Sequence, residues 1–135
     1  MLDFVDAFFR VPLSPDERQY FVIKYGDKFL RWNRIAQGSV NGPQLFGRLA
    51  ALIGRLTQRT LDDSRSRLHI YLDDPIIAMR GSRKEVEIEV TLAVLMWRCM
   101  NVDLAFLKGQ VGTAITWTGH DISINMQELS ITSVM

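Results

Sequence analysis

The chain has 135 residues, 47% of them hydrophobic and 23% charged, which is typical of one globular domain and excludes a disordered chain. No apolar run approaches the roughly 20 residues needed to cross a bilayer, and the N-terminus carries carboxylates where a secretion signal needs positive charge. The single cysteine, Cys99, excludes an internal disulfide, and its apolar neighbours predict a buried thiol. We therefore expect an intracellular protein, of cytoplasm or nucleus, that meets no membrane.

Charge is distributed unevenly, although the net charge is only +1. Residues 1–60 carry nine Lys and Arg against five Asp and Glu, residues 61–84 carry five against four, and residues 85–135 carry two against six. The positive excess lies in the first 84 residues. A polyanionic partner and a solvated surface of mixed charge explain that excess equally well.

The first half of the chain predicts strands followed by a helix. Residues 2–9, rich in β-branched and aromatic residues, predict a strand. Residues 20–25 and 28–35 predict two strands that meet at Gly26-Asp27, a typical hairpin turn. Residues 43–60 predict a helix that begins at a proline. The apolar positions that define this helix are Leu45, Leu49, Leu52 and Leu56.

The second half begins with a predicted hairpin and a second helix. Residues 67–72 and 75–79 predict two strands with Asp73-Asp74 at the bend between them. Ser82, with Glu85 three residues later, predicts a capping box. Residues 85–90 alternate like a strand, but the longer segment to residue 100 has apolar residues at helical spacing, and we predict a helix. These apolar residues are Val86, Val90, Ala93, Trp97 and Met100.

Two short predicted strands, residues 111–118 and 121–124, follow around Gly119. Strands and helices in this order predict an α+β fold, a mainly antiparallel sheet with two helices packed on one face. No repeat, low-complexity tract or linker divides the chain. We expect one domain over residues 1–125 and a C-terminal tail over residues 126–135.

Three carboxylates occupy positions that invite a cation. Asp3 lies inside an otherwise apolar predicted strand, where an ionised carboxylate is costly to bury without compensation. Asp73 and Asp74 are adjacent at a tight bend, where their like charges repel. If the two strands lie side by side, the three side chains supply the hard oxygen ligands that magnesium prefers. Taken alone, two aspartates in a hairpin turn are more often turn chemistry than a metal site.

Four motifs, in order, resemble the reverse transcriptase family. They are Leu-Asp-Phe-Val-Asp-Ala-Phe-Phe at residues 2–9 with Val-Pro-Leu at 11–13, Gln-Gly-Ser-Val-Asn-Gly-Pro at 37–43 with Leu-Phe at 45–46, Tyr-Leu-Asp-Asp at 71–74, and Leu104 to Lys108 followed by Trp-Thr-Gly at 117–119. The third matches the family's Tyr-x-Asp-Asp signature, and the fourth resembles its lysine motif and primer-grip hairpin. The resemblance covers residues 2–125 and implies the palm of a polymerase that copies RNA into DNA.

The resemblance also implies roles for the catalytic residues. Asp3, Asp73 and Asp74 become metal ligands of a two-ion site that holds Mg²⁺, with Mn²⁺ as an alternative ion. Lys108 becomes the residue that protonates the leaving pyrophosphate, although a solvated loop lysine explains its position equally well.

Further implied roles concern the substrates. Phe8 would stack under a deoxyribose and exclude a 2′-hydroxyl by its bulk, so the resemblance implies deoxynucleotides. Gln37 and Gly38 match positions that contact the incoming nucleotide and template, and Tyr71 belongs to the signature beside the site. The implied partners are deoxynucleoside triphosphates and an RNA or DNA template with its primer.

Other residues extend the implied nucleic-acid surface. Trp117 and Gly119 match the primer grip. Basic residues on one stripe of the helix at 43–60 are candidates for contact with nucleic-acid backbone, namely Arg48, Arg55 and Arg59. A stripe of small residues on the same helix indicates close approach of a neighbouring helix or, slightly less favoured, of template backbone.

Some features depart from the family pattern. Gly42 stands where the family usually has serine, and Pro75 directly follows the aspartate pair and removes a donor from that strand. The chain begins beside the first motif, so we expect fingers and thumb segments to be missing, with residues 20–35 a remnant of a fingers hairpin. The isolated chain is then expected to be inactive. The alternative is a catalytically silent palm remnant that at most binds nucleic acid.

Overall fold

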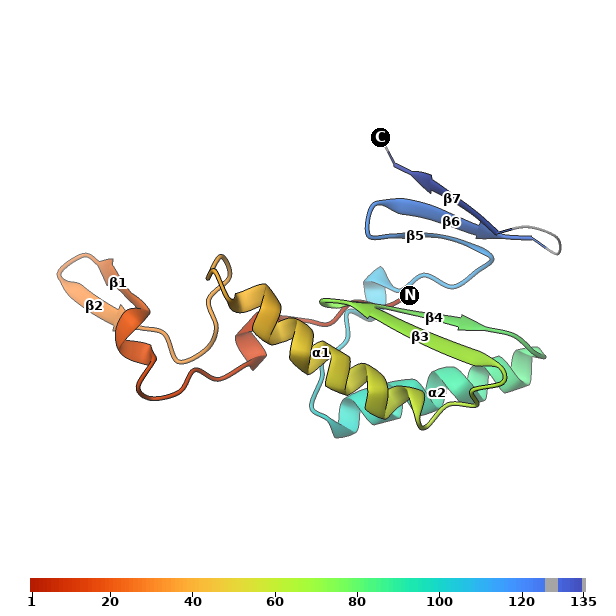
Figure 1. The fold of residues 1–135 in the computed structure, drawn as a ribbon, viewed down its shortest axis with the longest axis horizontal. Helices are drawn as coiled ribbons and strands as arrows, with labels where there is room; N and C mark the ends of the chain where they lie inside the picture. The colour runs from red at the N-terminus through yellow and green to blue at the C-terminus, as the bar shows by residue number, and fades with distance from the viewer. Residues whose placement is uncertain (126–128, 135) are drawn as a thin grey trace.

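The computed structural model describes residues 1–125 and 129–134, and the molecule is elongated (Figure 1). Its strands are β1 (Val22–Tyr25), β2 (Lys28–Arg31), β3 (Ser66–Tyr71), β4 (Asp74–Met79), β5 (Ala114–Trp117), β6 (His120–Ile124) and β7 (Leu129–Ser133). Its α-helices are α1 (Gly42–Gln58) and α2 (Arg83–Cys99), and single 3-10 turns lie at Phe8–Arg10 (η1), Arg18–Tyr20 (η2) and Phe106–Lys108 (η3).

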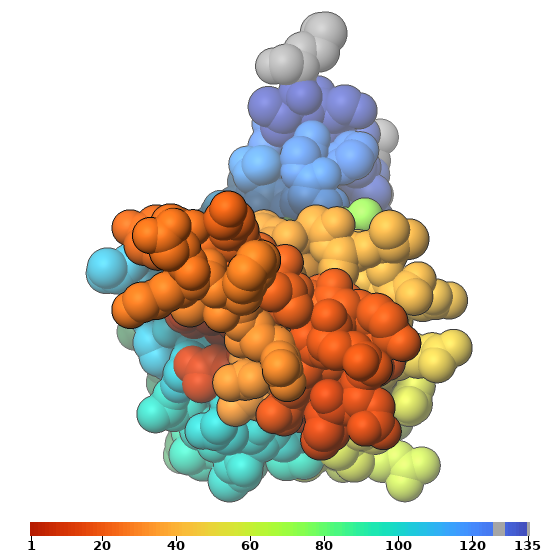
Figure 2. All heavy atoms as spheres, turned by 90° about the vertical axis from the view of Figure 1, so that its left-hand side faces the viewer, coloured from red at the N-terminus to blue at the C-terminus, as the bar shows by residue number. Residues whose placement is uncertain are grey.

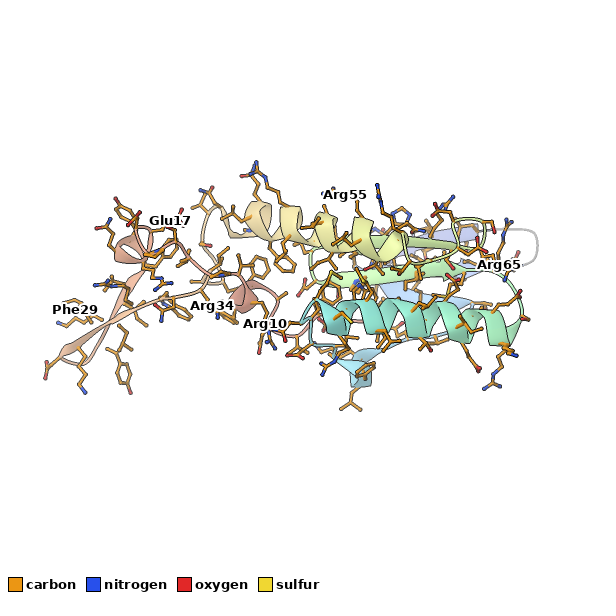
Figure 3. The ribbon with its side chains drawn as sticks, turned by 90° about the horizontal axis from the view of Figure 1, so that it is seen from below. Arg10, Glu17, Phe29, Arg34, Arg55 and Arg65 are labelled. Carbon is orange, nitrogen blue, oxygen red and sulfur yellow. The ribbon has the colours of Figure 1, made fainter. Side chains whose placement is uncertain are left out.

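The elements form layers around the β3–β4 hairpin. Helices α1 and α2 lie side by side on one face of this hairpin, and the β5–β6–β7 sheet lies on the other side (Figures 1 and 3). The β1–β2 hairpin extends beyond the N-terminal end of α1. Every strand pair in the described residues is antiparallel, which confirms the predicted α+β fold, although these strands form three small sheets instead of one. No helix in the described ranges is both long and apolar enough to cross a membrane.

The segment predicted as a strand over residues 2–9 is extended only at its start. The backbone N–H of Leu2 donates to the Pro75 carbonyl at 3.1 Å and that of Phe4 to the Asp73 carbonyl at 2.9 Å, so this stretch lies along the β3–β4 turn. A turn follows, in which Asp6 has a positive φ of 52°, and η1 begins at Phe8. The strand prediction is therefore wrong for the second half of the segment, because propensity does not reveal a reversal at an aspartate.

Helix α1 has the predicted bounds within two residues but a different buried face. Its buried residues are Gly42, Phe46, Ala50, Ile53 and Thr57. Three of the four leucines predicted as its apolar stripe are exposed: Leu45, Leu52 and Leu56, at 44%, 46% and 39%. Gly54 allows a close approach of β3, since an added Cβ at this position would lie 3.3 Å from the Ile70 side chain. The neighbour of Gly54 is thus a strand and not the expected helix, whereas an added Cβ at Gly47 meets nothing within 4 Å among the described residues, so the approach of template there stays a prediction.

Helix α2 confirms the helical reading of an ambiguous segment. Ala93 and Trp97 are buried and the Ser82–Glu85 capping box is formed. The Ser82 backbone N–H donates to a Glu85 carboxylate oxygen at 2.8 Å, and these hydrogen bonds hold the pKa of Glu85 below its usual value. Cys99 at the end of the helix is exposed, so the expected burial of its thiol is wrong.

Replacing Ser82 with alanine is expected to destabilise the fold by about 1 kcal/mol, because the first turn of α2 loses its cap. Chemical denaturation of both proteins measures the loss. Lys84→Ala is the matched control, since Lys84 lies in the same turn, is exposed and makes no side-chain hydrogen bond with the described residues. An equal loss in both variants would contradict the cap.

The capping box also makes the stability of the fold depend on pH. Because the folded-state pKa of Glu85 is depressed, the contribution of Glu85 to the free energy of unfolding is present above the pKa of a free glutamate and disappears as pH falls through the lower, folded value.

The buried core joins the helices to the N-terminal segment. It consists of Phe4, Ala7, Phe46, Ala50, Ile53, Leu61, Ala93, Trp97 and Leu104. The last strand, β7, comes from the region that we expected to be a tail, and it pairs with β6 over its full length. Residues 126–128 and 135 of that region lie outside the described residues. The domain boundary itself stays a prediction.

Candidate active site

The β3–β4 hairpin places the aspartate pair at the middle of the molecule. Tyr71 and Asp74 are the last paired residues, so Leu72 and Asp73 form a two-residue turn. Leu72 has a positive φ of 52°, which is uncommon outside glycine, and its side chain packs against the core. Packing of this partly buried leucine against the core holds the turn in a conformation that otherwise suits glycine.

Asp3 is held beside this turn from both sides. On one side Phe4 N–H donates to the Asp73 carbonyl, and on the other Ala105 N–H donates to the Asp3 carbonyl at 2.9 Å. Val5 N–H completes this second edge with a 2.9 Å bond to the Asp103 carbonyl. Asp3 and Asp73 therefore come from adjacent segments, as predicted, although 70 positions separate them in the chain.

One cavity of about 430 Å³ gathers side chains from all four motifs. Five of its lining residues are candidates from the sequence: Asp3, Phe8, Gln37, Asp73 and Lys108. Phe8 is half-buried in it and packs against Phe46 of α1, with ring centroids 5.1 Å apart. Gly38, next to Gln37, has a φ of +87°, a conformation that L side chains rarely adopt.

A lysine already compensates one of the carboxylates. Lys108 Nζ lies 2.5 Å from Asp3 Oδ2, with the Asp3 side chain 15% and the Lys108 side chain 70% exposed. The hydrogen bond and the charge of Asp3 raise the pKa of Lys108 above its usual value. Burial, followed by the negative charges of Asp73 and Asp3, raises the pKa of Asp74. The site therefore concentrates negative charge for which one ammonium is the nearest compensation.

The carboxylates fit a hard divalent cation by their chemistry, since aspartate oxygens are the ligands that magnesium prefers. Asp3 and Asp73 line the cavity and would be the first to hold the ion. In the described part of the chain, however, no three His, Cys, Asp or Glu side chains are close enough together to bind a metal as they stand. Lys108 would have to leave Asp3, and Asp74 to turn toward the cavity, before three carboxylates could share ions.

The candidate primer grip is joined directly to the aspartate turn. Trp117, at the end of β5, donates its indole N–H to the backbone carbonyl of Asp74 at 3.1 Å. Thr118 and Gly119 form the turn to β6, with positive φ values of 48° and 77° that suit the hairpin turn typical of antiparallel strands. This contact joins the β5–β6 hairpin to the start of β4.

Other candidates lie apart from the cavity. Tyr71 is 60% exposed on β3. Arg48, Arg55 and Arg59 are exposed on α1, and Arg55 projects from the helix away from α2 (Figure 3). No ion pair involves these three arginines within the ranges that the structure describes. Their contact with nucleic acid stays a prediction.

Sequence reasoning missed Asp103. Its carboxylate accepts hydrogen bonds from Arg10 and from Arg98, the latter at 2.7 Å, and its backbone carbonyl bonds Val5. These contacts tie the N-terminal segment and α2 to the stretch that carries Lys108. A single acidic residue in a loop gives no signal for such a role.

The antiparallel strands, the two helices on one face and the acidic hairpin define a polymerase palm-like protein. A family model described as reverse transcriptase (RNA-dependent DNA polymerase) matches residues 1–122, and the chain belongs to this family. The chain is 37% identical over 84 residues to a Gag-Pol polyprotein of avian reticuloendotheliosis virus, covering 58% of this chain and 7% of the polyprotein.

Two further relatives are Pol polyproteins. That of feline endogenous virus ECE1 is 34% identical over 84 residues, covering 58% of this chain and 8% of the polyprotein. That of equine infectious anemia virus (isolate 1369) is 32% identical over 97 residues, covering 63% of this chain and 8% of the polyprotein. The chain thus spans less than a tenth of the length of these relatives and is of retroelement origin.

Proposed function

We propose that this chain is the palm of an RNA-directed DNA polymerase, which transfers deoxynucleotides to a primer 3′ end by two-metal catalysis. The observation that carries the proposal is the cavity that gathers Asp3, Phe8, Gln37, Asp73 and Lys108. These residues come from four separate segments of the chain, and each would have a part in nucleotidyl transfer.

The ions would be held by Asp3 and Asp73, with Asp74 as the further ligand, and magnesium is the metal that such oxygens favour. When bound, two ions activate the attacking oxygen and stabilise the leaving one. Lys108 Nζ reaches the same place and would donate its proton to the leaving pyrophosphate. Phe8, packed on Phe46, would close the space under the sugar and favour deoxyribose.

The chain exposes more surface than a self-sufficient domain of its size. Its accessible surface is 9852 Å², whereas a compact monomer of 15.5 kDa is expected to expose about 7,200 Å². The exposed surface includes large hydrophobic side chains, among them Leu45, Leu52 and Leu56 of α1. This supports a palm that works together with further protein and with a template and primer. We therefore expect no measurable primer extension by the 135 residues alone, because catalysis depends on positioning that the chain cannot supply by itself.

The second candidate is a silent palm remnant that at most binds nucleic acid. The Lys108–Asp3 ion pair favours it, because the lysine occupies the place that a cation would need. If metal binding displaces Lys108 from Asp3, the site is an active site at rest. If Lys108 stays paired with Asp3 and no metal binds, the site has decayed.

The test measures binding of Mn²⁺ to the full chain in the presence of a deoxynucleoside triphosphate. The magnetic resonance signal of the Mn²⁺ ion reports the binding. The polymerase palm is expected to bind the metal–nucleotide pair in the cavity, and Lys108→Ala is expected to tighten binding of the metal alone because it frees Asp3. No binding of metal or nucleotide by either protein would count against the two-metal palm and favour the silent remnant. Deoxynucleotide bound no more tightly than ribonucleotide would contradict the role of Phe8.

A further inference from the structure

The Asp103 carboxylate joins two arginines from distant parts of the chain. Arg10 donates to its Oδ2, and Arg98 donates to its Oδ1 at 2.7 Å, so each carboxylate oxygen has a guanidinium of its own. Figure 3 shows Arg10 beside the C-terminal end of α2, the end that carries Arg98. The side chains of Asp103 and Arg10 are 40% and 41% exposed. Exposed ion pairs contribute little to the stability of a fold, so stability is a weak reason for this arrangement.

The ion pair with Arg10 holds the turn that carries Phe8. Phe8 begins η1 and Arg10 ends it, and no residue of this turn is buried. Phe8 packs on α1, and Phe9 stacks on Trp32 with ring centroids 5.9 Å apart. The third side-chain contact is that of Arg10 with Asp103. Because η1 is a single turn of tight 3-10 geometry, a shift of Arg10 is passed on to Phe8.

The backbone of the same segment holds the first aspartate of the cavity. The Asp103 carbonyl accepts a hydrogen bond from Val5 N–H at 2.9 Å, and Ala105 N–H donates to the Asp3 carbonyl at 2.9 Å. Figure 2, which looks onto the end of the molecule with β1 and β2, shows red atoms of the N-terminal segment beside cyan atoms from around residue 100. Asp103 is thus bonded through its side chain to the turn with Phe8 and through its backbone to the segment with Asp3.

We infer that Asp103 is a positioning residue for sugar selection, and that its ion pair with Arg10 sets how closely Phe8 approaches the sugar of a bound nucleotide. Phe8 and Asp3 line the same cavity, so the distance between ring and metal ligand decides where the sugar fits. Placement matters at this scale, since a displacement of about 1 Å can change a rate by about 100-fold. The inference rests on the proposed function and deepens it, because it concerns the choice between deoxyribose and ribose.

Competition between a deoxynucleoside triphosphate and the matching ribonucleoside triphosphate, in the Mn²⁺ assay with the full chain, measures selection as the ratio of the two dissociation constants. Arg10→Gln removes the contact with η1 and keeps that of Arg98. We expect this variant to lower the ratio by about threefold to fivefold, the range that an exposed ion pair supports, through tighter ribonucleotide binding. Asp103→Glu keeps the carboxylate and should keep most of the ratio.

A double-mutant cycle shows whether Asp103 acts through Arg10. Asp103→Asn should lower the ratio as much as Arg10→Gln, and the two changes together should lower it no further, because both remove one contact. Arg98→Gln is the matched control, since it takes the other guanidinium from the same carboxylate and leaves η1 alone. An unchanged ratio in Arg10→Gln, or an equal fall in Arg98→Gln, would overturn the inference.

The position of η1 is followed separately, without metal or nucleotide. The Trp32 and Phe9 rings lie stacked at 12° to each other, so a fluorine label on Trp32 reports a shift of η1. The full chain labelled with fluorotryptophan is measured by magnetic resonance in EDTA, and Trp32→Phe assigns the signal. We expect this signal to shift in Arg10→Gln and Asp103→Asn and to stay in place in Arg98→Gln.

The two measurements separate the failure of the inference from that of the proposed function. A Trp32 signal that shifts as expected, in a chain that binds neither nucleotide, would keep Asp103 as the residue that positions η1 and would count against the proposed function. Nucleotide binding with a ratio and a Trp32 signal that ignore Arg10→Gln would overturn the inference alone.

Discussion

Replacing Asp73 with asparagine is expected to abolish metal-dependent binding of a deoxynucleoside triphosphate while leaving the fold at least as stable. Asparagine keeps the size of the side chain but removes the charge that a divalent ion needs. The negative charge of Asp73 also repels that of Asp74, so removing the Asp73 charge relieves this repulsion. Loss of binding with retained or improved stability is the pattern of a residue kept for function at the expense of stability.

The control is Asp63→Asn, which removes an exposed carboxylate bonded to Arg67 at 3.1 Å, away from the cavity. It should bind the metal–nucleotide pair like the unchanged chain, and its exposed ion pair contributes only about 0–1 kcal/mol to stability. Isothermal titration with magnesium and nucleotide, together with thermal unfolding, measures both properties. Undiminished binding by Asp73→Asn would remove the two-metal proposal, and equal loss in Asp63→Asn would show a general charge effect.

The sequence predicted where helix α1 lies in the chain better than it predicted which face of the helix is buried. In α1 the leucines repeat at helical spacing, yet Phe46, Ala50 and Ile53 form the buried face. Both stripes have the same period, and periodicity alone does not tell which one a strand will cover. The approach of Gly54 to Ile70 decides it, and that contact depends on β3, sixteen positions further along the chain.

The candidate site shows the same limit. The three carboxylates predicted that Asp3 and Asp73 would converge across adjacent strands, and both side chains line one cavity. The ion pair of Lys108 with Asp3 joins residues 105 positions apart, and the bond of Trp117 to the Asp74 carbonyl spans 43. Such contacts arise when segments pack, so residue types predict the participants of the site but not which of them are paired at rest.

Replacing Trp97 with alanine is expected to destabilise the chain by about 3–5 kcal/mol, a large share of the stability of a small domain. Trp97 is 1% exposed and contacts the Phe4 ring edge to face, with centroids 5.4 Å apart. Phe4 is the residue after Asp3, and its backbone N–H donates to the carbonyl of Asp73, so the Phe4–Trp97 contact supports the segments that carry both aspartates. The cavity left by alanine would weaken this support.

Trp97→Phe separates packing from hydrogen bonding. The indole Nε1 of Trp97 is buried and has no hydrogen-bond partner among the described residues, and an unsatisfied buried donor carries a penalty of about 1–3 kcal/mol. Phenylalanine keeps an aromatic edge for Phe4 and removes this donor, so the lost volume and the relieved penalty should offset each other to within about 1 kcal/mol. Urea denaturation of both variants measures the difference. Equal destabilisation by phenylalanine and alanine would mean that the indole N–H has a partner in solution, and a small effect of alanine would mean that Trp97 is not part of the core.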